Sequence, residues 1–232
     1  MSFVSVRKLI LSILAFFALL PFSFSKNISV SILGGEDLNN FSITIKRGSY
    51  SLKLDKKVYN LSVGNRVIIE HGQYASIGDS IRFKITSFKM IGDDYVNHFE
   101  VSLGMRSITY DDHLYVQMYK NQIRLINEVD LDRYVAGVVE GEAGYNLPLE
   151  YYKLQAILCR TYALKNLDRH SKDGFDLCDK VHCQVYHKKC KQNDIIKATA
   201  STSGLVVVDH DLELINTTFH SNCGGQTCNS ED

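Results

Sequence analysis

The 232-residue sequence contains no tryptophan, only 2 prolines, and no cysteine before position 159. With 26 basic and 26 acidic residues it also carries no net charge when histidine is neutral. Nucleic-acid-binding domains usually carry a clear excess of basic residues, so this balance argues against a nucleic-acid partner. The 13 tyrosines and 11 phenylalanines supply the aromatic surface of a chain that is 45% hydrophobic, which is enough for one large or two small domains.

Residues 1–25 have the pattern of a signal peptide. The basic residues Arg7 and Lys8 precede an apolar stretch, and Ser23 and Ser25 form a small-x-small cleavage pattern. The alternative is an uncleaved membrane tether, because the apolar stretch approaches the shortest length that spans a bilayer. Both interpretations predict an exported protein of the cell envelope, either periplasmic or extracellular.

Residues 26–127 predict a β-rich region, because short β-branched and aromatic segments are separated there by turn residues. These segments are ISVSIL, FSITIK, YSLKL, NRVIIE, IRFKITSF, HFEVSL, LYVQMY and QIRLINEV. Helical periodicity begins after Val129, and strand-like sequence returns between Gly204 and Phe219. The expected fold class is α+β, with a β-rich N-terminal part followed by a buried central helix and further strands.

The first expected helix begins at Asp130 as N-cap and stops near Gly144. At about 100° per residue, Glu142 falls on the same stripe as the apolar positions, whereas Glu140 points the opposite way into solvent. Partial burial and the negative end of the helix dipole would raise the pKa of Glu142, as a general acid requires. The alternative is a helix-terminal acid paired with a base.

A second helix is expected from Pro148, in its first turn, to about Leu167. Its residues are apolar nearly all round, which predicts a buried helix with Arg160 in its midst. A buried arginine requires an anionic or hydrogen-bonding partner. Glu142, a cluster of backbone carbonyls and a bound substrate are the three candidates, and a purely structural arginine is the alternative to a functional one.

All 6 cysteines follow position 158, and two of them form a compact C-x3-H-C pattern with a histidine: Cys178, His182 and Cys183. Thiolate and imidazole are ligands that Zn²⁺ prefers, which predicts a structural zinc site. Water, His220 or Cys223 would complete it. The alternative is a disulfide in an exported protein, either Cys178–Cys183 or Cys223–Cys228.

Three blocks of the sequence resemble the SpoIID/LytB family, named after the stage II sporulation protein D. They are LDRYVAGVVEGEAGYNLPLEYYKLQAILCRTYAL, DLCDKVHCQVY and FHSNCGGQT, and they lie in the family's order between residues 126 and 227. On this resemblance, residues 128–232 form the SpoIID-like catalytic region. The sequence ends soon after the last block, so its C-terminus is expected to be truncated.

The resemblance implies a lytic transglycosylase that cuts peptidoglycan glycan strands, with the family's catalytic glutamate falling on Glu142. That single glutamate would act first as acid and then as base, leaving 1,6-anhydro-N-acetylmuramic ends without any metal in the chemistry. The family's Glu-Met-Pro triplet is Glu-Ala-Gly here, which leaves the loop after Glu142 less defined. The alternative function is a non-catalytic glycan-binding module that enhances a cell-wall amidase.

The resemblance also gives candidates for the remaining site residues. Gln155, Arg160 and Tyr162 would orient Glu142 or the sugar. Contacts with the substrate are expected from Tyr145 and from the last block, at Ser221, Gly224 and Gly225. The expected partners are glycan strands and a cell-wall amidase or other wall hydrolase.

Overall fold

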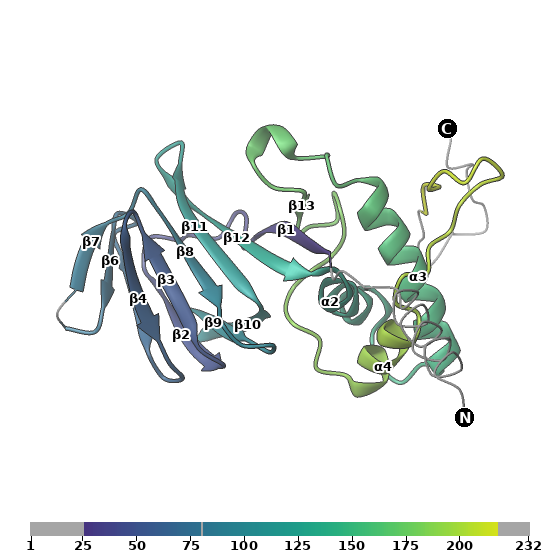
Figure 1. Ribbon diagram of the computed structural model, residues 1–232, viewed down its shortest axis with the longest axis horizontal. Helices are drawn as coiled ribbons and strands as arrows, with labels where there is room; N and C mark the ends of the chain where they lie inside the picture. The colour runs from purple at the N-terminus through teal and green to yellow at the C-terminus, as the bar shows by residue number, and fades with distance from the viewer. Residues whose placement is uncertain (1–25, 80, 218–232) are drawn as a thin grey trace, which may run out of the picture.

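The computed structural model describes residues 26–79 and 81–217 and places strands first and helices second (Figure 1). This order confirms the predicted α+β class. The predicted signal peptide lies outside the described residues. Among those residues, no helix is long and apolar enough to cross a membrane.

A seven-stranded sheet has the order β13-β1-β12-β11-β8-β3-β4. Its strands are antiparallel except for β13, which pairs in parallel with β1 and thereby joins a late segment to the first strand. The strands are β1 (Asn27–Ile32), β3 (Tyr50–Leu54), β4 (Lys57–Leu61), β8 (Ser87–Gly92), β11 (His113–Tyr119), β12 (Gln122–Asp130) and β13 (Leu177–Cys178). The domain boundary expected after residue 127 lies inside β12.

A six-stranded antiparallel sheet has the order β10-β9-β2-β5-β6-β7. Its strands are β2 (Phe41–Arg47), β5 (Arg66–Glu70), β6 (Tyr74–Ile77), β7 (Ile81–Lys84), β9 (His98–Leu103) and β10 (Arg106–Asp111). Side chains of the two sheets meet in the core, where the rings of Tyr50 and Phe99 lie edge to face with centroids 6.5 Å apart. The segment IRFKITSF, predicted as one strand, is divided between β7 and β8.

In the described part of the chain, three α-helices lie beside the sheets: α2 (Leu131–Ala143), α3 (Leu149–Lys165) and α4 (Asn193–Ser201) (Figure 1). Helix α2 lies between the β region and the other two helices in this view, and most of its residues are buried. The expected caps are confirmed at Asp130, which accepts a hydrogen bond from the Arg133 backbone, and at Gly144, which has φ of 74°.

Two details of the expected α+β arrangement differ in the structure. Helix α3 is buried along one side rather than all round, since Leu149, Tyr151 and Leu154 are 42%, 39% and 52% exposed. Up to Thr217, the stretch that begins at Gly204 forms one isolated bridge instead of a strand pair, between Val208 and Leu214. Neither difference changes the fold class.

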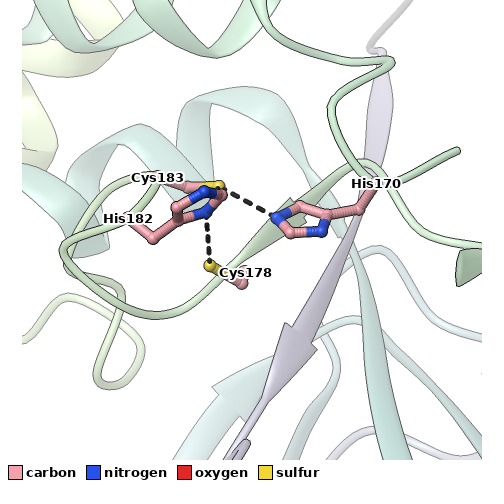
Figure 2. Close-up of side chains that lie close together, drawn as sticks. All are labelled: His170, Cys178, His182 and Cys183. Carbon is pink, nitrogen blue, oxygen red and sulfur yellow. Dashed lines mark hydrogen bonds between the residues drawn. The ribbon is translucent and has the colours of Figure 1, made fainter.

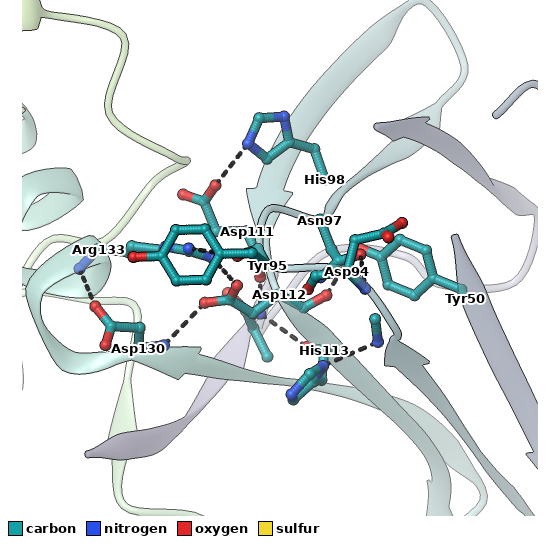
Figure 3. Close-up of polar contacts among 12 residues, drawn as sticks. Tyr50, Asp94, Tyr95, Asn97, His98, Asp111, Asp112, His113, Asp130 and Arg133 are labelled. Carbon is teal, nitrogen blue, oxygen red and sulfur yellow. Dashed lines mark hydrogen bonds and ion pairs between the residues drawn. The ribbon is translucent and has the colours of Figure 1, made fainter. Parts of the chain in front are cut away.

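A polar network joins the β region to the start of α2 (Figure 3). Asp112 accepts a hydrogen bond from the Asp130 backbone at 2.9 Å and forms an ion pair with Arg133. Arg133 also donates to the Tyr95 carbonyl at 2.8 Å. Burial raises the pKa of Asp112, opposed by the Asp130 amide and by Arg133. These contacts fix the direction in which α2 leaves the sheet.

Candidate functional site

The two glutamates of α2 have environments opposite to those predicted. Glu142 is exposed in the last turn, whereas Glu140 is only 6% exposed. The prediction that Glu140 is solvated and that Glu142 is shielded by the apolar stripe is therefore wrong. The physical reason is that a later segment, residues 185–191, lies across the helix on the side that periodicity alone assigns to solvent.

Both carboxylates hold that later segment. Glu142 Oε1 accepts a hydrogen bond from the Val185 backbone N–H at 3.0 Å, and Glu140 Oε2 accepts one from the Lys191 backbone N–H at 3.1 Å. Each glutamate thus satisfies a backbone donor of a segment with little secondary structure of its own. Glu142 differs from Glu140 in that it remains accessible to a ligand.

Two glycines allow the segment to approach the helix closely. A Cβ atom at Gly137 would lie 2.7 Å from the Lys188 carbonyl oxygen and 2.7 Å from the Tyr186 ring. A Cβ atom at Gly141 would lie 2.8 Å from the Val185 carbonyl oxygen. The glycines in the sequence GVVEG are therefore explained by backbone packing against the later segment.

We expect Gly137→Ala to destabilise the protein by about 1–3 kcal/mol, because backbone and a buried ring must move to admit a methyl group. Alanine normally stabilises a helix relative to glycine by about 1 kcal/mol. A loss of stability in this variant would therefore indicate the steric clash. Urea denaturation would measure it. A more stable variant would show that the segment does not pack against α2 in this way.

Arg160 is 1% exposed, which confirms its predicted burial. Its Nε and Nη2 donate to Asp132 Oδ1 at 2.9 and 2.7 Å. The remaining donors reach three backbone carbonyls, those of Ala156, Thr199 and Leu205. The guanidinium has five N–H groups, and all five are used.

These contacts decide between the expected partners of Arg160. The carbonyl cluster is confirmed, while Asp132, which sequence reasoning missed, takes the place proposed for Glu142. Asp132 also accepts a hydrogen bond from the Ser203 hydroxyl just beyond α4. Arg160 therefore ties α2, α3 and the end of α4 together, and no donor is left over for a substrate.

The remaining candidate site residues differ in how far they are exposed to solvent. Gln155 is 8% exposed; its Nε2 donates to the Tyr151 hydroxyl at 3.4 Å, and its Oε1 has no partner among the described residues. The Tyr162 hydroxyl accepts a hydrogen bond from Arg169 at 2.7 Å, and burial raises its pKa. Tyr145 is 53% exposed just beyond Glu142. Within the described ranges, no hydrogen bond joins these three residues to Glu142.

Cys178, His182 and Cys183 converge as the sequence predicted, and His170 joins them (Figure 2). His182 Nδ1 lies 3.8 Å from Cys178 Sγ and 3.6 Å from Cys183 Sγ. His170 Nε2 lies 3.4 Å from Cys183 Sγ. Sequence reasoning missed His170 because a loop that includes the short helix η1 (Ser171–Asp173) separates it from the motif.

The four donors fit a tetrahedral zinc ion. Zn–S bonds of about 2.3 Å and Zn–N bonds of about 2.0–2.1 Å place neighbouring donor atoms roughly 3.3–3.8 Å apart. The sulfur–nitrogen distances of 3.4, 3.6 and 3.8 Å fall in that range, and all four ligand atoms lie within 4.8 Å of one another. The cluster could therefore hold a metal ion without large movement.

Strand β1 anchors this cluster. Cys178 belongs to β13, and β13 pairs with β1. Asp176 Oδ2 accepts hydrogen bonds from the backbone and hydroxyl of Ser29, both at 2.7 Å. Asp179 Oδ2 accepts one from the Leu33 backbone at 2.6 Å. The two aspartates on either side of Cys178 therefore fix the loop on strand β1.

The four cysteines within the described ranges are free thiols. Burial raises the pKa of Cys159, and it raises that of Cys190 to about 12. Both stay protonated at neutral pH and are poor nucleophiles. The alternative disulfide Cys178–Cys183 is not formed, and Cys223–Cys228 lies outside the described residues.

Glu142 and the cluster are connected by one short loop. Val185, whose N–H binds Glu142, follows Cys183 by two positions. Gln184 lies between them and bridges the Tyr134 hydroxyl, at 3.2 Å, and the Cys159 carbonyl, at 3.3 Å. The position of Glu142's partner is therefore set by the same loop that carries His182 and Cys183.

The polar junction at the other end of α2 contains a cavity of about 860 Å³. His98 Nε2 lies 3.1 Å from Asp111 Oδ1 there, and Arg133 lines the cavity too (Figure 3). Glu142 is not among its lining residues. Ser221, Gly224 and Gly225, together with His220 and Cys223, lie outside the described residues, so their predicted roles stay predictions.

Residues 119–208 match the family model SpoIID, described as "Stage II sporulation protein". The chain is also similar to an uncharacterized protein of Brachyspira hyodysenteriae, with 22% identity over 209 residues, which is 88% of this chain. The chain spans 57% of that relative's length. The predicted SpoIID resemblance is thereby confirmed, and it covers α2, α3, the cysteine–histidine cluster and α4.

Proposed function

We propose, from the SpoIID family membership of residues 119–208, that this chain is a lytic transglycosylase of peptidoglycan glycan strands. The family match itself indicates a role in sporulation or the cell wall. The observation that carries the finer proposal is Glu142, an exposed carboxylate within the matched segment. Its Oε1 is held by the Val185 N–H, and its Oε2 has no hydrogen-bond partner among the described residues.

The chemistry needs only one carboxyl group. Protonated Glu142 gives its proton to the glycosidic oxygen as the bond to C1 of N-acetylmuramic acid breaks. The carboxylate then takes the proton of that sugar's C6 hydroxyl, whose oxygen bonds to C1. The products are a free hydroxyl end and a 1,6-anhydro end. No water is consumed, whereas a hydrolytic glycosidase normally needs a second carboxylate.

Analysis of reaction products tests this function. The full-length protein is incubated with purified glycan strands, and the ends are identified by mass spectrometry. A lytic transglycosylase produces 1,6-anhydro ends, which have one water less than hydrolysed ends. Hydrolysed ends, or strands that stay intact under conditions where binding is measurable, would exclude it.

A second function is favoured by one specific feature, the loss of Met and Pro after the glutamate, which is followed here by Ala143 and Gly144. A glycan-binding module that enhances a cell-wall amidase would not need a shaped loop at this point. It would leave strands uncut but increase the release of stem peptides by a partner amidase. Both functions require export, with residues 26 onward outside the cytoplasm.

We also propose that His170, Cys178, His182 and Cys183 hold one structural Zn²⁺. The support is the convergence of two sulfur and two nitrogen donors, with three sulfur–nitrogen distances in the range of a tetrahedral zinc site. When bound, zinc with four protein ligands cross-links a loop and has no open position for a substrate. The chain's own residues would carry the proton transfers, and the cross-link would hold the loop that places Val185 against Glu142.

We expect the reduced protein to contain about one Zn²⁺ per chain and to lose it in His170→Ala, because that variant lacks one of four ligands. Chelation should increase protease sensitivity between residues 170 and 185 without changing the type of glycan end. Metal analysis and thiol titration measure the first effect. His187→Ala, an exposed histidine of the same loop outside the cluster, is the control. Zinc-free protein with Cys178 and Cys183 oxidised to each other would contradict the site.

A further inference from the structure

The hairpin of strands β11 and β12 contacts the loop that carries His170. Tyr119 ends β11 and Arg124 lies in β12, both on the face of the hairpin opposite its buried side chains. The Tyr119 hydroxyl donates to Asp173 Oδ1 at 3.2 Å, and Arg124 Nη1 donates to the Asp173 carbonyl at 2.6 Å. The Asp173 N–H in turn donates to the His170 carbonyl at 2.8 Å. Two side chains of the β-rich region therefore hold the helix η1 next to His170.

A series of stacked groups connects the same hairpin with the imidazole of His170. Arg124 Cζ lies 3.6 Å from the centroid of the Tyr119 ring and 5.2 Å from that of the Phe175 ring. The Phe175 ring stacks on the His170 imidazole, with centroids 4.8 Å apart and an angle of 24° between the planes. Phe175 is 8% exposed and the Arg124 side chain 17%, so these contacts are largely shielded from water. Cation–π contacts are stronger when they are desolvated.

These contacts hold the His170 imidazole in an orientation that suits metal binding. Its Nε2 lies 3.4 Å from Cys183 Sγ, within the four-donor cluster (Figure 2). Its Nδ1 lies 3.8 Å from Asp173 Oδ2, which is too far for a hydrogen bond but close enough for the carboxylate to favour a proton on Nδ1. That tautomer leaves Nε2 free to bind a metal ion.

We propose that Arg124 is a positioning residue for the zinc ligand His170, acting through the Phe175 ring and the backbone of Asp173. The inference rests on the zinc site of the proposed function, and it makes a hairpin of the β-rich region part of that site. Mutation of residues that hold a metal ligand in place typically changes metal affinity by about 10–100-fold. The physical reason is that a side chain already held in its bound orientation loses less conformational entropy when the metal binds.

The test measures the Zn²⁺ affinity of the reduced full chain by competition with a chelating indicator dye. Arg124→Ala should bind Zn²⁺ about 10–100-fold more weakly than the parent protein. Arg124→Lys should show most of this loss, because an ammonium keeps the charge but lacks the planar group that contacts both rings. Full affinity in Arg124→Lys would show that charge rather than stacking is required and would overturn the proposal.

Phe175→Leu tests the path by which Arg124 acts on His170. Leucine keeps an apolar side chain at this buried position but removes the ring that contacts both the guanidinium and the imidazole. The loss of Zn²⁺ affinity should be similar to that of Arg124→Ala, and the double variant should lose less than the product of the two single losses. Unchanged affinity in Phe175→Leu, or two losses that multiply in full, would overturn the proposed path.

Thermal unfolding with and without Zn²⁺ separates positioning from a purely structural role. A structural role lowers the melting temperature of both forms alike, whereas positioning reduces the increase that Zn²⁺ produces, because a more weakly bound ligand stabilises the folded state less. Arg82→Ala is the matched control, since Arg82 lies 4.9 Å from the Tyr74 ring centroid and pairs with Glu70 at 3.1 Å in the other sheet. It should leave the Zn²⁺ affinity unchanged. A loss as large as that of Arg124→Ala would overturn the proposal.

The outcomes distinguish this inference from the zinc site on which it rests. A parent protein that binds no Zn²⁺ would overturn the zinc site and the inference with it. If the parent binds Zn²⁺ and Arg124→Ala binds it equally tightly, the zinc site stands and the inference alone falls. The proposed transglycosylase activity is tested separately by the glycan ends, because no strand is cut in these measurements.

Discussion

Glu142→Gln should abolish cleavage of glycan strands while leaving fold and strand binding intact. The amide keeps the shape of the carboxyl group, and its oxygen can still accept the Val185 N–H, but it supplies no proton to the leaving oxygen. Loss of general acid catalysis costs about 10²–10⁴-fold in rate, and loss of the base in the second step adds to it. The measurement is the rate at which anhydro ends appear, followed by mass spectrometry.

Glu140→Gln is the matched control for this experiment. Glu140 lies on the same helix and also accepts one backbone N–H from the segment of residues 185–191, but it is buried. Its amide variant should cut strands at nearly the parental rate. If Glu140→Gln is inactive and Glu142→Gln is active, then the catalytic assignment of Glu142 is wrong. Cleavage would then depend on the contact between Glu140 and the segment of residues 185–191.

Arg160→Ala should destabilise the protein by about 3–5 kcal/mol, the range expected when one partner of a buried ion pair is removed. The change leaves Asp132 without its cation and strips donors from three carbonyls in and beyond α3 and α4. Denaturant titration at constant pH measures the loss. Activity should fall in proportion to the unfolded fraction, because Arg160 has no donor directed at a substrate.

A double-mutant cycle with Asp132→Ala sharpens this prediction. If the ion pair is the main interaction, the double variant should be less destabilised than the sum of the two single variants. Arg160→Lys keeps the charge but cannot make five directed hydrogen bonds, so it should remain clearly destabilised. Full stability in Arg160→Ala would mean that the guanidinium is not buried between the three helices.

Helix boundaries and most strands were predicted correctly, because they depend on residues close to each other in the sequence. The cap at Asp130, the stop at Gly144 and the extent of α3 follow from side chains within a few residues of each boundary. Most strands of the β region were found by alternation and turn residues. The missed strands are β4, β6 and β10, and of these β4 and β6 contain few buried side chains.

The environments of the site residues depended on distant segments and could not be predicted by periodicity. Glu140 is buried because residues 185–191 lie on it, and the signal for this was the pair of glycines at positions 137 and 141. Asp132 was missed as a partner of Arg160 because α2 and α3 meet only in the folded chain. His170 was missed because the completing ligand was expected to be water, His220 or Cys223, whereas His170 precedes Cys178 by eight positions and meets it only through the fold of the loop.

The parallel pairing of β13 with β1 has a consequence for how the chain assembles. The hydrogen bond between Ser29 and Asp176 joins residues 147 positions apart. Such contacts form late, because the entropy of closing a long loop must be overcome before they stabilise anything. The cluster of two cysteines and two histidines therefore has no fixed support until the chain has been synthesised beyond Asp179. Cys178 is part of β13 and Cys183 follows it by five positions, so both thiols are synthesised at about the point where this strand pair can first form.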